Sequence, residues 1–111
     1  MEVFDIKSDM PSALEAGKRL ADIIRDAKQR QLKVIKILHG YGSSGEGGKI
    51  NVLVRKSLSK RMNKGEIKAY IPGEAISMMM GFDEYITNYK ELIKYDSDFI
   101  KGNDGITYVI I

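Results

Sequence analysis

Cysteine and tryptophan are absent from this sequence, and histidine and proline are scarce. The 111 residues include no Cys, no Trp, one His and two Pro. Without cysteine the chain has neither a disulfide framework nor a thiolate metal site. No apolar run approaches the roughly 20 residues that a membrane-spanning helix needs, and the opening M-E-V-F-D-I-K resembles no signal or transit peptide. The composition therefore favours a cytoplasmic protein with no membrane partner.

The length fits one domain with a single hydrophobic core. Charged residues make up 30% of the chain and apolar residues 43%, which is ordinary for a globular protein. No internal repeat, low-complexity tract or linker divides the sequence. We therefore expect residues 1–111 to form one domain.

The net charge of +3 is unevenly distributed. Residues 32–68 hold nine basic and two acidic residues, whereas residues 69–111 hold three basic and seven acidic ones. A concentrated basic segment is the electrostatic signature of a protein that binds a polyanion. Nucleic acid is therefore the predicted partner, and the sequence identifies no protein partner.

The most distinctive stretch joins an apolar segment to a glycine-rich one. Residues 34–38 read V-I-K-I-L, the pattern of a buried strand. His39 follows, then five glycines between residues 40 and 48, then an amphipathic helix expected from about Lys49 to Met62. Glycines let the backbone approach a ligand closely, and a helix N-terminus favours an anion. The pattern predicts a phosphate-binding turn over residues 40–49.

The rest of the chain alternates strands and helices. Strands are expected at residues 3–6, 66–71 and 106–111, a long helix after the Ser12-x-x-Glu15 capping box, and a shorter helix at 83–94. Residues 96–98 and 101–105 are rich in turn formers. The order is strand, helix, strand, helix, strand, short helix, strand. It predicts an α/β fold, a two-layer sandwich with a mixed four-stranded sheet.

The first strand, helix and second strand predict a right-handed parallel crossover. Parallel strands end at the same edge of a sheet. Asp5 and Lys7 should therefore lie beside His39 and the glycine-rich turn. Ligands of open α/β sheets collect at this carboxyl edge.

Two familiar nucleotide motifs fail on inspection. Residues 40–45, G-Y-G-S-S-G, satisfy G-x-G-x-x-G, but no acidic residue ends the next strand and the chain is too short for a dinucleotide fold. A Walker loop fails because Ile50 follows Gly48-Lys49 where Ser or Thr is required. A generic anion-binding nest or a simple flexible loop remains.

Each candidate residue also has a structural interpretation. A lone histidine such as His39 is either a core residue or a proton carrier. Tyr41 could stack on a base or pack on its loop. The lysines of the second helix either follow a phosphate backbone or form a solvated face. Asp96 and Asp98 either help bind a cation or cap a turn.

Five segments, taken in order along the chain, match one known pattern. Glu15-Ala16 lies in the first helix, and V-I-K-I-L-H-G-Y-G spans residues 34–42. V-R-K-S-L, I-K-A-Y-I-P and G-I-T-Y-V-I follow at residues 54–58, 67–72 and 105–110. Taken together, these segments resemble the Smr (small MutS-related) domain family. The resemblance implies a two-layer α/β fold that acts as a DNA-nicking or RNA-cleaving nuclease, or as a nucleic-acid-binding module. Residues 73–103 then look like an insertion.

The first motif departs from the family. The family has D-L-H-G, or a version with a basic residue in place of the histidine, where this chain has D-I-K-S at residues 5–8. One hypothesis is phosphodiester hydrolysis, with Asp5 as base or metal contact, His39 orienting or protonating, and Lys7 and Lys49 stabilising charge. A second is a non-catalytic RNA- or DNA-binding adaptor, and a third is a small-molecule phosphate binder.

The predicted site consists of catalytic residues and nucleic-acid-binding residues. The predicted catalytic residues are Asp5, Lys7 and His39. The predicted nucleic-acid-binding residues are Gly40, Tyr41, Gly42, Ser43, Ser44, Gly45, Lys49, Arg55, Lys56 and Lys60. No residues predict a metal centre within the protein, although a divalent cation such as Mg²⁺ stays open as a cofactor. The choice between RNA and DNA also stays open.

Overall fold

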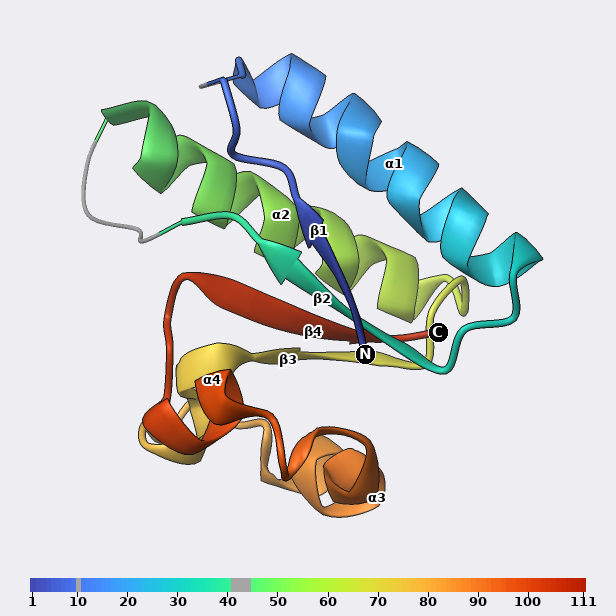
Figure 1. The fold of residues 1–111 in the computed structure, drawn as a ribbon, viewed down its shortest axis with the longest axis vertical. Helices are drawn as coiled ribbons and strands as arrows, with labels where there is room; N and C mark the ends of the chain where they lie inside the picture. Colours follow the sequence, from blue (N-terminus) through green and yellow to red (C-terminus); the bar gives the residue numbers. More distant parts are fainter. Residues whose placement is uncertain (10, 41–44) are drawn as a thin grey trace.

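Strands and helices follow one another in the predicted order, except that two more short helical segments, at residues 73–76 and 97–101, accompany the expected short helix before the last strand (Figure 1). The computed structural model describes residues 1–9, 11–40 and 45–111. The elements are β1 (Glu2–Asp5), α1 (Ala13–Gln29), β2 (Val34–Leu38), α2 (Gly45–Asn63), β3 (Ala69–Pro72), the 3₁₀ helix η1 (Gly73–Ile76), α3 (Asp83–Ile93), α4 (Ser97–Lys101) and β4 (Ile106–Ile110). None of the helices in these ranges has the length and apolar character needed to cross a membrane.

The sheet has the order β1-β2-β4-β3, so the last strand of the chain lies in its interior. β1 pairs with β2 in parallel, as the crossover predicted, and β4 pairs antiparallel with both β2 and β3. The mixed four-stranded α/β sheet is thereby confirmed. β4 alone connects β3 to the β1–β2 pair.

Helices α1 and α2 cover one face of the sheet (Figure 1). Leu20 and Ile24 of α1 and Val54 and Leu58 of α2 are buried with Ile37 of β2 in one core cluster. Burying a side chain of this size contributes about 1.5–3 kcal/mol relative to leaving it in water. This packing forms the predicted two-layer sandwich.

The segment between β3 and β4 covers part of the second face of the sheet (Figure 1). Ile93 of α3 and Phe99 of α4 are buried with Ile71, Ile106 and Tyr108 of the sheet. The rings of Phe99 and Tyr108 meet edge to face, with centroids 6.2 Å apart. The 73–103 segment is therefore held by a core cluster of its own.

One helix begins earlier than predicted, and another forms where turns were predicted. α2 begins at Gly45 rather than near Lys49, so the last glycines of the turn are helical. Glycine is a poor helix former, but the packing of a long amphipathic helix overrides local propensity. Residues 97–101, expected in turn-rich sequence, form the short helix α4 instead. Burial of Phe99 supplies the tertiary contact that such a short helix needs.

Lys36 interrupts the apolar strand β2 and points toward the second face, where it is only 8% exposed. Its Nζ lies 3.0 Å from Asp96 Oδ2 and 2.7 Å from Asp98 Oδ2, and the Tyr108 hydroxyl donates to Asp96 at 2.5 Å. Burial lowers the pKa of Lys36, but the bonds to Asp98 and Asp96 outweigh it and the pKa is raised overall. The cation of the Asp96–Asp98 pair is thus a side chain of the protein itself.

We predict that replacing Lys36 by Met destabilises the fold by about 3 kcal/mol, because two partly buried carboxylates lose their cation. Urea unfolding of K36M at pH 7 measures the loss. The triple variant K36M/D96N/D98N should recover part of it, since no charge is then left unpaired. Lys28→Met, at an exposed position of α1, should change the free energy of unfolding little. An unchanged urea midpoint for K36M would contradict this account of Lys36.

Candidate nucleic-acid interface

The parallel strands β1 and β2 end at one edge of the sheet and bring two distant segments together. The amide of Ile6 donates to the carbonyl of Leu38 at 3.1 Å, extending the pairing past β1. Gly40 has φ +82°, and a Cβ added there would lie 3.3 Å from Lys7 Cδ. Lys7 therefore lies directly against the turn that follows His39, so a larger residue at position 40 would be strained by its backbone and crowded by Lys7.

Asp5 is oriented by its own turn at this edge. Its Oδ1 accepts from the amides of Lys7 and Ser8 at 2.9 and 3.1 Å, and its Oδ2 accepts from the Ser8 hydroxyl at 2.8 Å. Lys7 Nζ lies 3.7 Å from Oδ2. Partial burial raises the pKa of Asp5, but the hydrogen bonds from Ser8 and Lys7 outweigh it, leaving the pKa below its ordinary value. The carboxylate is ionised at neutral pH and already accepts three hydrogen bonds.

His39 is completely buried. Its Nδ1 lies 2.9 Å from the carbonyl oxygen of Gly40, which can only accept, so Nδ1 carries the proton. Nε2, 2.8 Å from Thr107 Oγ1, then accepts from that hydroxyl. Burial lowers the pKa of His39, and the nearby Arg55 guanidinium adds to this effect, opposed by the bond to Gly40. The imidazole is therefore neutral, and both its nitrogens have partners inside the protein.

The Arg55 side chain connects the hydrogen bonds around His39 to Glu74. Its two terminal nitrogens bind the Glu74 carboxylate in a bidentate pair, each bond 2.7 Å long, and its Nε donates to Thr107 Oγ1 at 3.3 Å. Arg55 and Glu74 side chains are only 18% and 11% exposed. The guanidinium, a predicted nucleic-acid contact, is thus paired within the protein and shares Thr107 with His39.

A chain of hydrogen bonds links the 73–103 segment to the turn after His39. Asn103 donates from Nδ2 to Asp98 Oδ1 at 2.9 Å, and its Oδ1 accepts from the amide of Gly105 at 2.8 Å. The carbonyl of Gly105 accepts from the amides of His39 and Gly40 at 3.1 and 3.0 Å. His39 and Gly40 are therefore held by the backbone of Gly105, which Asn103 of this segment holds in turn.

The outer face of α2 carries exposed basic side chains. Ile50, Val54 and Leu58 of α2 are buried in the core beneath it. At about 3.6 residues per turn, the opposite side of the helix carries a different set, whose members are all exposed: Lys49, Val52, Lys56 and Lys60. Lys64, also exposed, follows just after the helix. A basic stripe, defined here as Lys49, Lys56, Lys60 and Lys64, thus runs along α2 from the end that follows the turn.

Four predicted binding residues, Tyr41, Gly42, Ser43 and Ser44, lie outside the described residues. Gly45 is the first residue of α2. The binding roles assigned to these residues stay predictions. In the described ranges no group of three or more His, Asp and Glu side chains is arranged as a metal site would require.

Sequence reasoning missed the polar residues that surround His39. Asn51 of α2 is 9% exposed, with its Nδ2 3.5 Å from the carbonyl of Gly40. Thr107 looked like one more β-branched core residue, and Glu74 followed what looked like a turn. Thr107 is the only side chain of β4 besides Tyr108 that can form hydrogen bonds, which is the one signal the sequence offered.

The fold and its edge define a small mixed α/β domain in which a strand ends in His-Gly and leads to a helix with a basic outer face. The Smr domain model matches residues 10–77, more than half of the chain, and the chain belongs to the Smr domain family. This family is associated with nucleic-acid binding and nicking. No curated protein and no solved structure matches the chain significantly.

We predict that His39 makes the fold less stable in mild acid. Its pKa is lower in the folded protein than the ordinary value near 6.5, so the unfolded chain binds the proton more tightly. The stabilisation is complete above about pH 6.5 and is lost as the pH falls below it, by at most ~1.4 kcal/mol per pH unit. Urea unfolding between pH 7.5 and 5 measures this for the wild type and for H39Q.

The difference between the free energies of unfolding of wild type and H39Q isolates the contribution of the histidine, because the carboxylates contribute equally to both proteins. H39Q should be less stable at pH 7.5, and the gap should narrow as the pH falls. A gap that stays constant with pH would show that His39 is not buried in the neutral form.

Proposed function

We propose that this Smr domain binds the phosphate backbone of nucleic acid with the basic stripe of α2. The observation that carries the proposal is the arrangement of Lys56 and Lys60, one turn apart on the exposed side of α2. Neither ammonium group forms an ion pair or hydrogen bond in the described part of the chain. A rise of about 1.5 Å per residue spaces residues 49, 56 and 60 over roughly 16 Å. That length spans several phosphates of a strand.

Lys7 extends this surface at the edge of the sheet. It lies against Gly40, at the turn that leads toward α2, and its side chain is 49% exposed. A nucleic acid that follows α2 toward its N-terminus would reach Lys7 and the positive end of the helix dipole. The proposal treats residues 1–111 as one domain, with residues 73–103 inserted to support this edge from the second face.

The geometry favours binding without cleavage. A general base must reach the proton that it removes, and His39 is fully buried with both ring nitrogens engaged. Asp5 already accepts three hydrogen bonds from its own turn. The two residues best suited to proton transfer are therefore engaged in the structure of the edge. This fits a non-catalytic adaptor module.

Phosphodiester cleavage is the second candidate function, and one observation favours it. The Asp5 side chain is 36% exposed and Lys7 lies beside it, so an ionised carboxylate and a cation meet the solvent together at the proposed binding edge. In that mechanism Asp5 would orient a water or a metal-bound ligand, and Lys7 would stabilise the developing charge on the phosphate.

We predict that K56Q/K60Q weakens binding to every RNA and DNA sequence alike, because phosphate contacts carry no sequence information. Fluorescence anisotropy with labelled oligonucleotides at 50–300 mM salt measures the effect. Each lost phosphate contact should reduce the slope of log K against log salt by about 1, so the double variant should reduce it by about 2.

Two control variants sharpen this test. K28Q/K101Q removes the same charge at exposed positions of α1 and α4 and should leave the slope near the wild-type value. R55Q should lower the free energy of unfolding, since Glu74 loses its partner, while changing the salt slope little. Equal slopes for K56Q/K60Q and the wild type would sink the α2 surface as the binding site.

For cleavage we expect a gel shift without product. Labelled single- and double-stranded RNA and DNA are incubated with the protein, with and without Mg²⁺, and resolved on native and denaturing gels. Asp5→Asn keeps the size of the side chain and serves as the comparison. Cleavage by the wild type that D5N abolishes, while binding is retained, would overturn the adaptor and establish the nuclease.

A further inference from the structure

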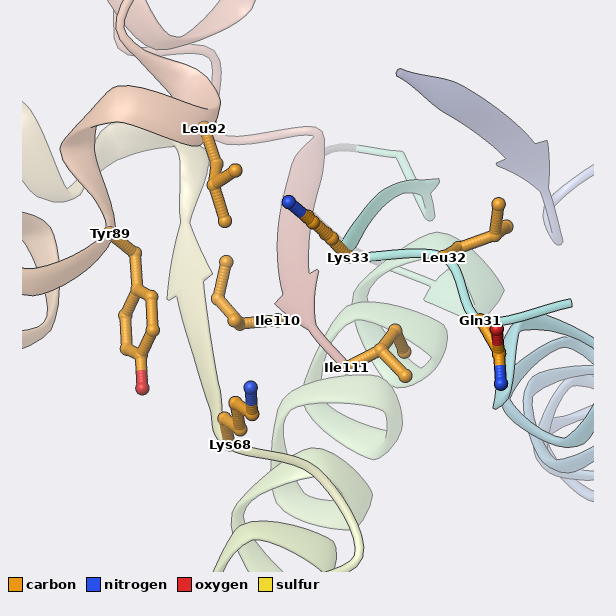
Figure 2. Close-up of a pocket in the computed structure, with 8 residues that line it drawn as sticks. All are labelled: Gln31, Leu32, Lys33, Lys68, Tyr89, Leu92, Ile110 and Ile111. Atoms are coloured by element: carbon orange, nitrogen blue, oxygen red, sulfur yellow. The ribbon is translucent and has the colours of Figure 1, made fainter. Parts of the chain in front are cut away.

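A hollow lies at the end of the sheet where β2 and β3 begin and β4 ends (Figure 2). It is the end opposite to His39, which follows β2. The volume of the hollow is about 510 Å³, within the range of small-molecule sites. The turn between α1 and β2, the start of β3, the end of β4 and one side of α3 contribute its walls. The lining residues are Gln31, Leu32, Lys33, Lys68, Tyr89, Leu92, Ile110 and Ile111.

Two lysines supply positive charge to this cleft. Lys33 and Lys68 are both exposed, and neither ammonium forms an ion pair or hydrogen bond within the described ranges. Their backbones are fixed, since the Lys68 amide donates to Ile110 at 2.9 Å and the Lys33 carbonyl accepts from Ile111 at 3.0 Å. In Figure 2 the two ammonium groups flank Ile110. The cleft therefore holds two cations, on separate strand ends, with no acidic side chain in its lining.

The other walls of the cleft are apolar or aromatic. Tyr89 and Leu92 extend from α3 and face Ile110 across the hollow (Figure 2). Tyr89 is only partly buried and lines the hollow. An aromatic ring beside aliphatic side chains suits a flat apolar group, which gains stacking as well as burial.

We propose that this cleft binds a nucleotide unit, with its phosphate between Lys33 and Lys68 and its base against Tyr89 and Leu92. A phosphate monoester supplies the two negative charges that two uncompensated lysines would neutralise. A base is the flat group that the aromatic and aliphatic wall would cover. The unit belongs either to a free mononucleotide or to the phosphorylated end of a strand.

The proposal does not depend on the α2 surface. Lys33 precedes β2, whereas the turn leading to α2 follows the opposite end of that strand. Four of the lining residues, Tyr89, Leu92, Ile110 and Ile111, lie after residue 77, where the family match ends. Tyr89 and Leu92 of α3 form one wall of the cleft, so the cleft needs the 73–103 segment.

The test is a titration of the ¹⁵N-labelled protein with AMP, followed by amide chemical shifts. Binding should shift the amides of Lys33, Lys68 and Tyr89 and leave Lys56 and Lys60 unmoved. K33Q/K68Q should weaken AMP binding at least tenfold, and K28Q/K101Q, with the same change in charge, less than twofold. Inorganic phosphate and adenosine should each bind more weakly than AMP, because each offers only half of the contacts.

Tyr89→Leu separates the two halves of the site. This substitution should weaken the binding of AMP severalfold and leave the binding of inorganic phosphate unchanged. Three results would overturn the proposal: no AMP binding at millimolar concentration, AMP shifts confined to α2, or K33Q/K68Q binding AMP like the wild type. Octanoate binding in the cleft without AMP binding would also overturn it, since the occupant would then be an apolar carboxylate.

Oligonucleotides distinguish the two sources of the ligand. A 5′-phosphorylated oligonucleotide that binds more tightly than its 5′-hydroxyl form, with the difference lost in K33Q/K68Q, supports a strand end. Equal affinities of the two forms, with AMP still bound, support a free mononucleotide. Because these variants leave Lys56 and Lys60 intact, failure here leaves the α2 proposal standing, and failure of K56Q/K60Q leaves this one standing.

Discussion

The structure depends on the insertion of β4 into the interior of the sheet. β4 is the last strand in sequence, yet it alone joins β3 to the β1–β2 pair. Side chains alternate between the faces of a strand, so neighbouring residues of β4 serve two different cores. Thr107 contacts the His39 and Arg55 side chains on one face, and Tyr108 contacts Asp96 on the other. Loss of β4 would therefore undo the sheet and both polar networks together.

Those two networks include four of the residues that the sequence offered for chemistry, namely His39, Arg55, Asp96 and Asp98. His39, Thr107, Arg55 and Glu74 form one of them, and Lys36 with its two aspartates forms the core of the other. A buried polar group is costly unless it is hydrogen-bonded. Each of these side chains forms a hydrogen bond or ion pair within the protein. In the described ranges, exposed cations such as Lys33, Lys56, Lys60 and Lys68 take part in neither network.

These cations form two separate surfaces. The basic stripe lies on the exposed side of α2. Lys33 and Lys68 lie at the end of the sheet, in the cleft that α3 helps to form. The first surface belongs to the part of the chain that the Smr domain model matches, and the second needs residues beyond it. The 73–103 segment has a role in both regions, because Asn103 holds Gly105 at the His39 turn and α3 forms one wall of the cleft.

The sequence by itself determined the order of the elements, the parallel crossover and the meeting of Lys7 with the turn after His39. Those features follow from local periodicity and from the handedness of short connections, which neighbouring residues encode. The tertiary structure alone decided which polar groups are buried and paired. Glu74 lies 19 residues from Arg55 and Asp96 lies 60 residues from Lys36, and no local pattern specifies partners at such distances. The same limit applies to the start of α2 and to α4, since packing against the rest of the fold, rather than helix propensity, decides where marginal helical residues become helical.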